Sequence, residues 1–278
     1  MKKYLIPLFF VLLGCGEHSL EEWLGGLSES SSSEEDSSSS SSRGGGLSSS
    51  SVGSGLSSSS IGSGNGGVVY GADVSYQGET YQTVVIGTQT WFQRNLNYAA
   101  TGSKCGDGNS LSDANTATCD TYGRLYNWAT AMKLPASCNT SSCSSSIGNP
   151  HQGICPTGWH IPSNADWDTL MTEVGGSVIL GSSIFAGKYL KATSGWANSS
   201  YGRSGNGTDD FGFTALPGGN GDSGDGFLYV GYGGYWWSAS EKDGDSAYHL
   251  SIRYFDESAG WYYYDKDFYL MSIRCVKD

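Results

Sequence analysis

Six cysteines in the second part of this chain constrain its fold more than any other feature. When a chain is exported, an even number of cysteines is typical of a disulfide framework, and six of them allow several sets of pairs. Proximity along the chain favours Cys105–Cys119 and Cys138–Cys143, which leaves Cys155–Cys275 as the third pair, although the sequence alone does not fix the pairing. The first two would close short polar loops. The third would join the middle of a domain to its end and stabilise it most, by about 4–5 kcal/mol in the chain-entropy model.

The amino terminus predicts export and a lipid anchor. Lys2 and Lys3 precede an apolar run that ends at Leu13. This run is too short to span a bilayer but fits the hydrophobic part of a signal peptide. The sequence Leu-Leu-Gly-Cys that ends at Cys15 is similar to the lipobox of bacterial lipoproteins. Residues 1–14 are therefore expected to be a cleaved lipoprotein signal peptide, the alternative being an ordinary signal peptide followed by an incidental cysteine.

A lipidated Cys15 would make the membrane a partner of this protein. The Cys15 thiol would be diacylated, with palmitate as a typical chain, and two acyl chains anchor stably where one does not. Because Gly16 rather than Asp follows the cysteine, we expect an exported protein that is anchored to the outer membrane and displayed on the cell surface.

A Ser/Gly-rich spacer separates this anchor from the rest of the chain. Residues 15–27 are the lipidated amino terminus, and residues 28–67 are mostly Ser and Gly, with the tandem nonapeptides LSSSSVGSG and LSSSSIGSG at 47–64. One or two apolar residues per repeat cannot build a core, so we expect disorder. A flexible linker of about 50 residues spans roughly 40 Å, which would hold a domain clear of a surface.

The remaining residues, 68–278, are enough for one domain with a sizeable core. They contain 12 basic and 20 acidic residues, a net charge of −8 out of the −12 of the whole chain. Nucleic acid and anionic membrane surfaces are therefore poor partners for this domain, and no nucleic-acid partner is expected.

The sequence of this domain predicts short elements of both kinds. Residues 81–91 resemble two short strands around Gly87, and residues 123–132 have an apolar stripe at helical spacing. Cys155 to Pro162 is expected to be extended. Ser163, with Asp166 three residues later, resembles a capping box, and the apolar residues after it have helical spacing up to Gly175-Gly176. Later stretches alternate apolar and polar residues, at 248–254 and 269–275, as strands do. With 42 glycines in the chain, the sequence favours an α+β fold of short strands, two short helices and long Gly-rich loops.

Six blocks in order carry a family resemblance. They are YQTVVIGTQTWFQRNLNY (81–98), YGRLYNWATAM (122–132), CPTGWHIPSNADW (155–167), FGFTALPGG (211–219), YWWSAS (235–240) and SIRCVKD (272–278). Together they resemble the Fibrobacter succinogenes major paralogous domain, whose members are typically exported lipoproteins with no established biochemical activity.

A more distant similarity concerns formylglycine-generating-enzyme-like domains. Their RLPTEAEWE block is similar to residues 158–167, and their closing GFRC strand to residues 272–278. Those domains have a C-type-lectin-like fold, with an irregular mixed sheet, two helices and long loops. The resemblance therefore implies a disulfide-stapled C-type-lectin-like fold for this domain.

Catalysis is not expected, because each candidate centre has a simpler structural explanation. Cys138 and Cys143 have the spacing of the copper-binding pair of the formylglycine-generating enzyme, but they precede the 158–167 block instead of following it. Cys155 and His160 resemble a nucleophile and its base, yet a nucleophilic cysteine must be free. A copper oxidase of the formylglycine-generating type is thus a distant alternative, and we predict a protein that is not an enzyme.

No cofactor or metal site is predicted, although calcium stays open. The four histidines have no zinc-type spacing. Oxygen ligands for Ca²⁺ could come from Asp and Asn side chains in Gly-rich loops, but these residues also favour turns by themselves. They are Asn206, Asp209, Asp210, Asn220, Asp222 and Asp225.

Two aromatic clusters are the clearest sign of a binding surface. One spans residues 229–237 and the other residues 261–264. Side chains alternate faces along a strand, so four consecutive aromatics cannot all point inward. The residues expected to contact a ligand are Trp237, Trp261, Tyr262, Tyr263 and Tyr232. For Trp236 and Trp237 the sequence leaves core packing equally open.

These features together predict a non-catalytic, lipid-anchored surface protein that binds extracellular polysaccharide through exposed aromatics. The alternative is protein–protein interaction, either with a surface protein or as a structural subunit of a surface assembly.

Overall fold

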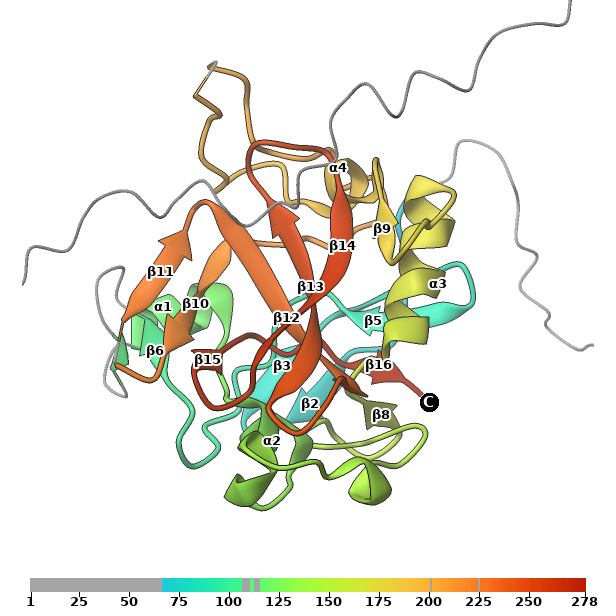
Figure 1. Cartoon of the computed structure of the whole chain (residues 1–278). Coiled ribbons are helices and arrows are strands. Elements are labelled where there is room, and N and C mark those ends of the chain that lie inside the picture. The colour runs from blue at the N-terminus through green and yellow to red at the C-terminus, as the bar shows by residue number, and fades with distance from the viewer. Residues whose placement is uncertain (1–66, 107–110, 113–115, 201, 225) are drawn as a thin grey trace, which may run out of the picture. The chain divides into compact units, whose positions relative to one another are not determined.

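The computed structural model describes residues 67–106, 111–112, 116–200, 202–224 and 226–278 (Figure 1). The expected signal peptide, Cys15 and all but the last residue of the expected spacer lie outside the described residues. In the part of the chain that is described, no helix has the length and apolar character needed to cross a membrane. The described part is of mixed α+β class, with many short strands, few short helices and three disulfides.

The first sheet brings together the two ends of the domain. Its strands, in spatial order, are β1 (Val69–Tyr70), β4 (Thr83–Ile86), β5 (Gln89–Phe92), β16 (Val276–Lys277) and β8 (Trp159–His160). β4 and β5 form the hairpin expected around Gly87, whose φ of 56° is a left-handed conformation that glycine adopts readily. The last strand, β16, lies between β5 and β8 and pairs with both.

The second sheet carries most of the aromatic residues. Its strands, in spatial order, are β11 (Phe227–Val230), β10 (Gly218–Asp222), β12 (Gly233–Glu241), β13 (Ser246–Arg253), β14 (Ala259–Asp265) and β9 (Ser182–Ser183). β15 (Tyr269–Leu270) pairs with β10 beside them. Two small hairpins are formed by β2 (Val74–Tyr76) with β3 (Glu79–Tyr81) and by β6 (Cys105–Gly106) with β7 (Leu111–Ser112).

The helices are short. They are α1 (Thr116–Tyr122), α2 (Trp128–Met132), α3 (Asn164–Gly175) and α4 (Ala186–Leu190), with 3₁₀ turns η1 (Ala136–Asn139) and η2 (Ser144–Ser146). α1 and α4 were not expected. α4 is only five residues long and lacks a side-chain cap, so no local signal marks it.

The prediction for α3 is confirmed. The Ser163 side chain accepts from the backbone N–H of Asp166, and the Asp166 carboxylate accepts from the backbone N–H of Ser163. This capping box satisfies two helix-end donors. The apolar stripe Trp167, Leu170, Met171 and Val174 is buried, and α3 lies against β9 and β14 (Figure 1).

The helix expected over 123–132 is wrong in its first part. Gly123 has a φ of 75°, which a right-handed helix does not allow. Leu125 and Tyr126 instead form bridges with Lys104 and Met271. Helix α2 starts only after Asn127, whose side chain caps it.

The central strands β12 and β13 are buried on both faces. Trp236, Leu250 and Ile252 belong to a core shared with α3, whereas Trp237 and Ala247 belong to a core shared with α2. The strand expected at 248–254 is confirmed as β13, and its polar residues His249 and Ser251 are buried as well, because this strand lies between two cores. Trp236 and Trp237 are each 0 % exposed.

The disulfides are Cys105–Cys119, Cys138–Cys143 and Cys155–Cys275, the three pairs that the sequence favours. The last one joins the extended segment before β8 to the residue before β16. Next to it, Arg274 is buried with its guanidinium donating to Asn95 Oδ1 and to the carbonyls of Phe92, Gln93 and Phe213. Burial lowers the pKa of Arg274 to about 9.

Candidate functional site

The aromatic run Trp261–Tyr264 is part of strand β14 and not of a loop, which corrects the sequence-based expectation. Because side chains alternate along a strand, the run divides between the two faces of the sheet. The register pairs Tyr262 with His249 and Tyr263 with Tyr248 on β13. Tyr262 and Tyr264 therefore lie on one face, and Trp261 and Tyr263 on the other.

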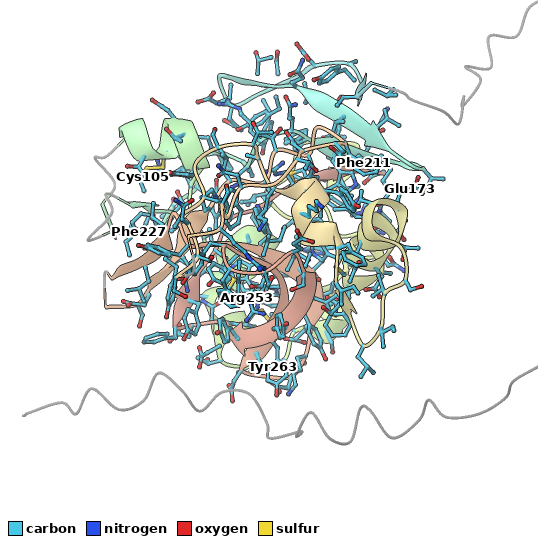
Figure 2. All side chains as sticks on the ribbon, turned by 90° about the horizontal axis from the view of Figure 1, so that it is seen from above. Cys105, Glu173, Phe211, Phe227, Arg253 and Tyr263 are labelled. Atoms are coloured by element: carbon cyan, nitrogen blue, oxygen red, sulfur yellow. A yellow bond between two sulfur atoms is a disulfide. The ribbon has the colours of Figure 1, made fainter. Side chains whose placement is uncertain are left out.

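Trp261 is tied to the body of the protein. Its indole nitrogen donates to Asp168 Oδ1 of α3 at 2.8 Å, and its ring packs edge-on against Tyr248 at 5.0 Å. Tyr263 beside it is exposed, with Lys242 Nζ 4.0 Å from the centre of its ring. The face of β14 that carries Trp261 thus offers one exposed tyrosine, Tyr263 (Figure 2), and its ring already contacts the ammonium group of Lys242.

The opposite face carries a larger group of aromatic rings. We name the tyrosine face after Tyr229, Tyr235, Tyr262, Tyr264 and Tyr269, which come from β11, β12, β14 and β15. The rings of Tyr264 and Tyr269 stack at 4.5 Å, and those of Tyr229 and Tyr235 lie 6.2 Å apart. Four strands from two separate stretches of the chain, 227–241 and 259–270, thus contribute five tyrosines to one face.

His249 forms the floor of the tyrosine face. Its ring stacks on Tyr264 at 4.7 Å and lies 6.1 Å from Tyr235 and 6.3 Å from Tyr262. It is 1 % exposed, and its Nδ1 has no hydrogen-bond partner among the described residues. Burial lowers the pKa of His249 to about 3, so the imidazole is neutral at physiological pH.

The tyrosine face is open to solvent, and its own side chains are uncharged, with the charges of Arg253, Asp222 and Asp265 nearby. Tyr229, Tyr262 and Tyr264 are 57 %, 45 % and 41 % exposed. Burial, followed by the neighbouring phenols, raises the pKa values of Tyr235 and Tyr269, and burial together with Tyr229 raises that of Tyr264. Neutral phenols on flat rings can stack on an apolar surface and donate hydrogen bonds at its edge.

The structure does not bring the five predicted ligand residues together. Tyr262 belongs to the tyrosine face, whereas Trp261 and Tyr263 lie on the other face of β14. Tyr232 packs against Tyr254 at 5.1 Å, in a different part of the sheet. Trp237 is a correction: it is fully buried, and its indole nitrogen donates to the carbonyl of Tyr126, so it cannot contact a ligand.

Sequence reasoning missed four residues of the tyrosine face as ligand candidates: Tyr229, Tyr235, Tyr264 and Tyr269. Strand alternation within 261–264 could have grouped Tyr264 with Tyr262. The aromatic cluster at 229–237 includes Tyr229, but nothing local indicates Tyr269, which reaches this face only through the pairing of β15 with β10.

The two candidate centres for cysteine chemistry hold disulfides. Cys138 pairs with Cys143, so that pair is not a dithiol ready for copper, and Cys155 pairs with Cys275, so it has no thiolate for His160 to activate. His160 instead contacts Asp278 Oδ1 at 2.8 Å and Asp166 Oδ2 at 3.4 Å. Burial alone would lower the pKa of His160, but these two carboxylates outweigh it and raise the pKa.

Two of the candidate calcium ligands, Asp209 and Asp222, make local turn contacts, whereas Asn220 Oδ1 is buried with no hydrogen-bond partner among the described residues. Asp209 accepts from the backbone and hydroxyl of Thr214, and Asp222 Oδ1 accepts from the backbone N–H groups of Gly224 and Gly226. Asp225 lies outside the described residues. Over the described ranges, no three His, Cys, Asp or Glu side chains are grouped so that they could hold a metal ion.

The comparisons with known proteins agree with the sequence blocks. The family model of the Fibrobacter succinogenes major domain matches residues 84–277, which include both sheets from β4 onward and the whole tyrosine face. No curated protein and no solved structure matches this chain.

Proposed function

Since this chain belongs to the Fibrobacter succinogenes major domain family, which brings no established activity, we propose a function from its own surface: a non-catalytic cell-surface protein that binds polysaccharide through the tyrosine face. In this proposal Cys15 carries the lipid anchor in the outer membrane, and the spacer presents the domain to the outside. The domain itself has a C-type-lectin-like fold.

The single observation that carries the proposal is the open, neutral array of five tyrosines. Sugar rings present apolar C–H faces and a rim of hydroxyl groups. Flat phenol rings match both, because the ring stacks and the hydroxyl group forms hydrogen bonds. A contiguous exposed aromatic surface of this kind marks an interaction site more often than an accident of folding.

A protein partner is the second candidate, favoured by the same residues. Tyrosine is enriched among the residues that dominate protein interfaces, and an uncharged patch on an acidic domain avoids the cost of desolvating charges. The two candidates differ in the ligand, which a binding experiment identifies.

The test is retention on insoluble neutral polysaccharides such as cellulose and xylan. The full mature chain, made soluble by Cys15→Ser, is compared with a Tyr262→Ala/Tyr264→Ala variant. Loss of two stacking rings should weaken retention about tenfold or more. Tyr263→Ala is the matched control, because it removes an exposed tyrosine of the same strand from the opposite face.

Retention that survives Tyr263→Ala but not the double change would support the tyrosine face. Equal loss in both variants would contradict it. Absence of retention on every polysaccharide would favour a protein partner, to be sought with the same three proteins.

A further inference from the structure

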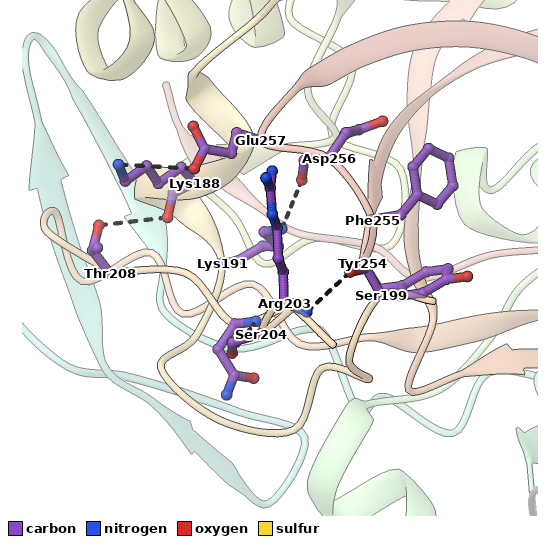
Figure 3. A pocket seen from close by; sticks show the side chains of 11 residues that line it. Lys188, Lys191, Ser199, Arg203, Ser204, Thr208, Tyr254, Phe255, Asp256 and Glu257 are labelled. Carbon is purple, nitrogen blue, oxygen red and sulfur yellow. Dashed lines mark hydrogen bonds and ion pairs between the residues drawn. The ribbon is translucent and has the colours of Figure 1, made fainter. Parts of the chain in front are cut away.

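A small pocket opens at the end of α4, away from the tyrosines just described. It has a volume of about 280 Å³ and lies between α4, the loop at 199–208 and the connection from β13 to β14 (Figure 3). The residues that decide its chemistry are Lys188, Lys191, Arg203, Asn206, Asp256 and Glu257.

Lys191 is a buried cation on the wall of this pocket. It is 2 % exposed, and its Nζ donates to the carbonyls of Asp256 at 2.8 Å and Arg253 at 3.2 Å. The ring of Trp196 lies 5.3 Å away. An ammonium group has three N–H donors, so one remains after these two hydrogen bonds, and both acceptors are neutral.

Lys266 shows how this protein completes such a site elsewhere. It is 0 % exposed, and its Nζ also donates to two carbonyls, those of Ser141 and Asp243, beside the ring of Trp128. In addition it donates to the Glu241 carboxylate at 2.8 Å. Lys191 likewise donates to two backbone carbonyls and lies near a tryptophan ring, but it borders a pocket where Lys266 has a carboxylate.

The acidic side chains of the pocket are already occupied. The Asp256 carboxylate accepts from Arg253 at 3.1 Å and from the backbone and hydroxyl of Ser258. Glu257 pairs with Lys188 at 3.8 Å. Of the charged groups that line the pocket, Lys191 and Arg203 are left with no carboxylate partner among the described residues.

Arg203 supplies the second unpaired positive charge. Its side chain is exposed and extends across the pocket toward the α4 side chains and Asp256 (Figure 3). The amide of Asn206 uses its oxygen to accept from the Trp196 backbone, which leaves its nitrogen as a further donor. The pocket is thus rich in donors and carries excess positive charge on a domain whose net charge is negative.

Ring contacts connect the pocket to the tyrosine face. Tyr254 lines the pocket and contacts Tyr232 at 5.1 Å, and the Tyr232 backbone N–H donates to the carbonyl of Tyr229. Tyr232 thus links the pocket to the tyrosine face through one ring contact and one backbone hydrogen bond.

We propose that this pocket binds the carboxylate of a hexuronate unit, so that the polysaccharide recognised by this protein is an acidic one. The proposal rests on the function proposed above and names its ligand class. The ligand carboxylate takes the place beside Lys191 that Glu241 takes beside Lys266, and Arg203 donates to the same group. The pocket volume suits one sugar residue, and bidentate guanidinium–carboxylate pairing suits a planar acid.

The probe is soluble polygalacturonate, compared with the same polymer in fully methyl-esterified form. Esterification removes the charge and keeps the sugar. Binding to the full mature chain with Cys15→Ser is measured by calorimetry at fixed ionic strength. Polygalacturonate should bind at least tenfold more tightly than the ester, since hydrogen bonds to charged groups are the stronger ones.

The variant is Arg203→Gln, because an exposed side chain can be changed without disturbing the core. It should weaken polygalacturonate binding about tenfold or more and leave binding of the ester unchanged. Lys277→Gln is the matched control: it removes one exposed positive charge on β16 and should leave both affinities unchanged, apart from a small non-specific effect of charge.

Binding of inorganic phosphate tests whether the pocket recognises a free anion instead of a hexuronate unit. Phosphate that binds in an Arg203-dependent manner while polygalacturonate does not compete would overturn the hexuronate assignment. Equal affinity for the acid and the ester would also overturn the hexuronate assignment. If the protein is still retained on neutral polysaccharides, the proposed function of the tyrosine face would remain supported. Absence of binding to every polysaccharide, acidic or neutral, would contradict both proposals.

Discussion

Two buried lysines in this protein have nearly the same surroundings and opposite consequences. Lys266 and Lys191 each lie beside a tryptophan ring, and each donates to two backbone carbonyls. The region of Lys266 is closed by Glu241, whereas the region of Lys191 opens into a pocket. A buried charge needs a counter-charge, and the protein provides one for Lys266 only.

This difference makes Lys266 part of a structural ion pair and Lys191 part of the proposed binding site. Glu241 also accepts from the backbone of Cys143 and the hydroxyl of Ser142, so the ion pair holds the Cys138–Cys143 loop against the end of β12. At Lys191 the described residues provide two backbone carbonyls and no hydrogen-bonded carboxylate. Burial lowers the pKa of Lys191, and the nearby charges of Asp256 and Glu257 offset this effect only in part.

The largest expected effect comes from Lys266→Met. It leaves the Glu241 carboxylate buried without its cation, which should cost about 3–5 kcal/mol of the free energy of unfolding. Urea unfolding measures it. Lys242→Met is the control, because Lys242 also lies above an aromatic ring but is exposed, and its variant should unfold at the wild-type urea concentration. Equal shifts in both variants would show that the ion pair contributes nothing special.

Removal of the Cys138–Cys143 disulfide should have the next largest effect. Cys138→Ala/Cys143→Ala opens a short loop, which costs about 2 kcal/mol in the chain-entropy model. It also loosens the backbone that contacts Glu241. If the loop acts through the ion pair, the losses from this change and from Lys266→Met should not add, and a double-mutant cycle in urea checks this. Strictly additive losses of unfolding free energy would show that the disulfide loop and the ion pair stabilise the fold independently.

Lys191→Met should destabilise less than Lys266→Met, by about 1 kcal/mol. It leaves no buried carboxylate behind, and the two carbonyls it frees can reach water in the pocket. Urea unfolding of the two methionine variants side by side tests the comparison directly. A loss for Lys191→Met as large as that for Lys266→Met would mean that Lys191 is a structural group and would weaken the case for a ligand.

The smallest expected effect is a difference in acid sensitivity. Burial alone would raise the pKa of Glu241, but hydrogen bonds from Lys266, Cys143 and Ser142 outweigh it and lower the pKa. Because the pKa is lower in the folded state, this contribution is present above about pH 4.5 and is lost as the pH falls through the folded-state value. Thermal unfolding between pH 6 and 3, in roughly half-unit steps, should show this loss in wild type.

The same pH series distinguishes the two lysines. Glu241→Gln/Lys266→Met should lose less stability on acidification than wild type, because it lacks the titrating ion pair. Lys191→Met should follow the wild-type profile, since it leaves the ion pair of Glu241 and Lys266 in place. A flattened profile in Lys191→Met would contradict the assignment of the acid response to Glu241.

Local signals in the sequence were enough for some parts of the fold. The Ser163 capping box and the apolar spacing after it predict α3, because a helix start is set by contacts within four residues. The short disulfide loops are likewise local. The helix expected at 123–132 starts late because Leu125 and Tyr126 pair with residues far along the chain, which no local pattern reveals.

The candidate sites were less predictable, for a physical reason. The aromatic run at 261–264 indicates a binding surface, but strand geometry divides it between two faces, and the register of β13 with β14 decides which tyrosines meet His249. Trp237 and Tyr232 look alike in sequence as candidates, yet one is buried between two cores and the other is exposed.

The sequence alone determined the class of this domain, its family and the presence of two aromatic clusters, and it favoured the disulfide pairs without fixing them. Only the tertiary structure decided which aromatic rings form one face and which buried lysine lacks a carboxylate. Both depend on long-range pairing: Glu241 reaches Lys266 across the antiparallel strands β12, β13 and β14, while Lys191 meets only the backbone of residues more than sixty positions away. A side chain's partners are set by the strand register and the packing of distant segments, and neither is encoded in its neighbours along the chain.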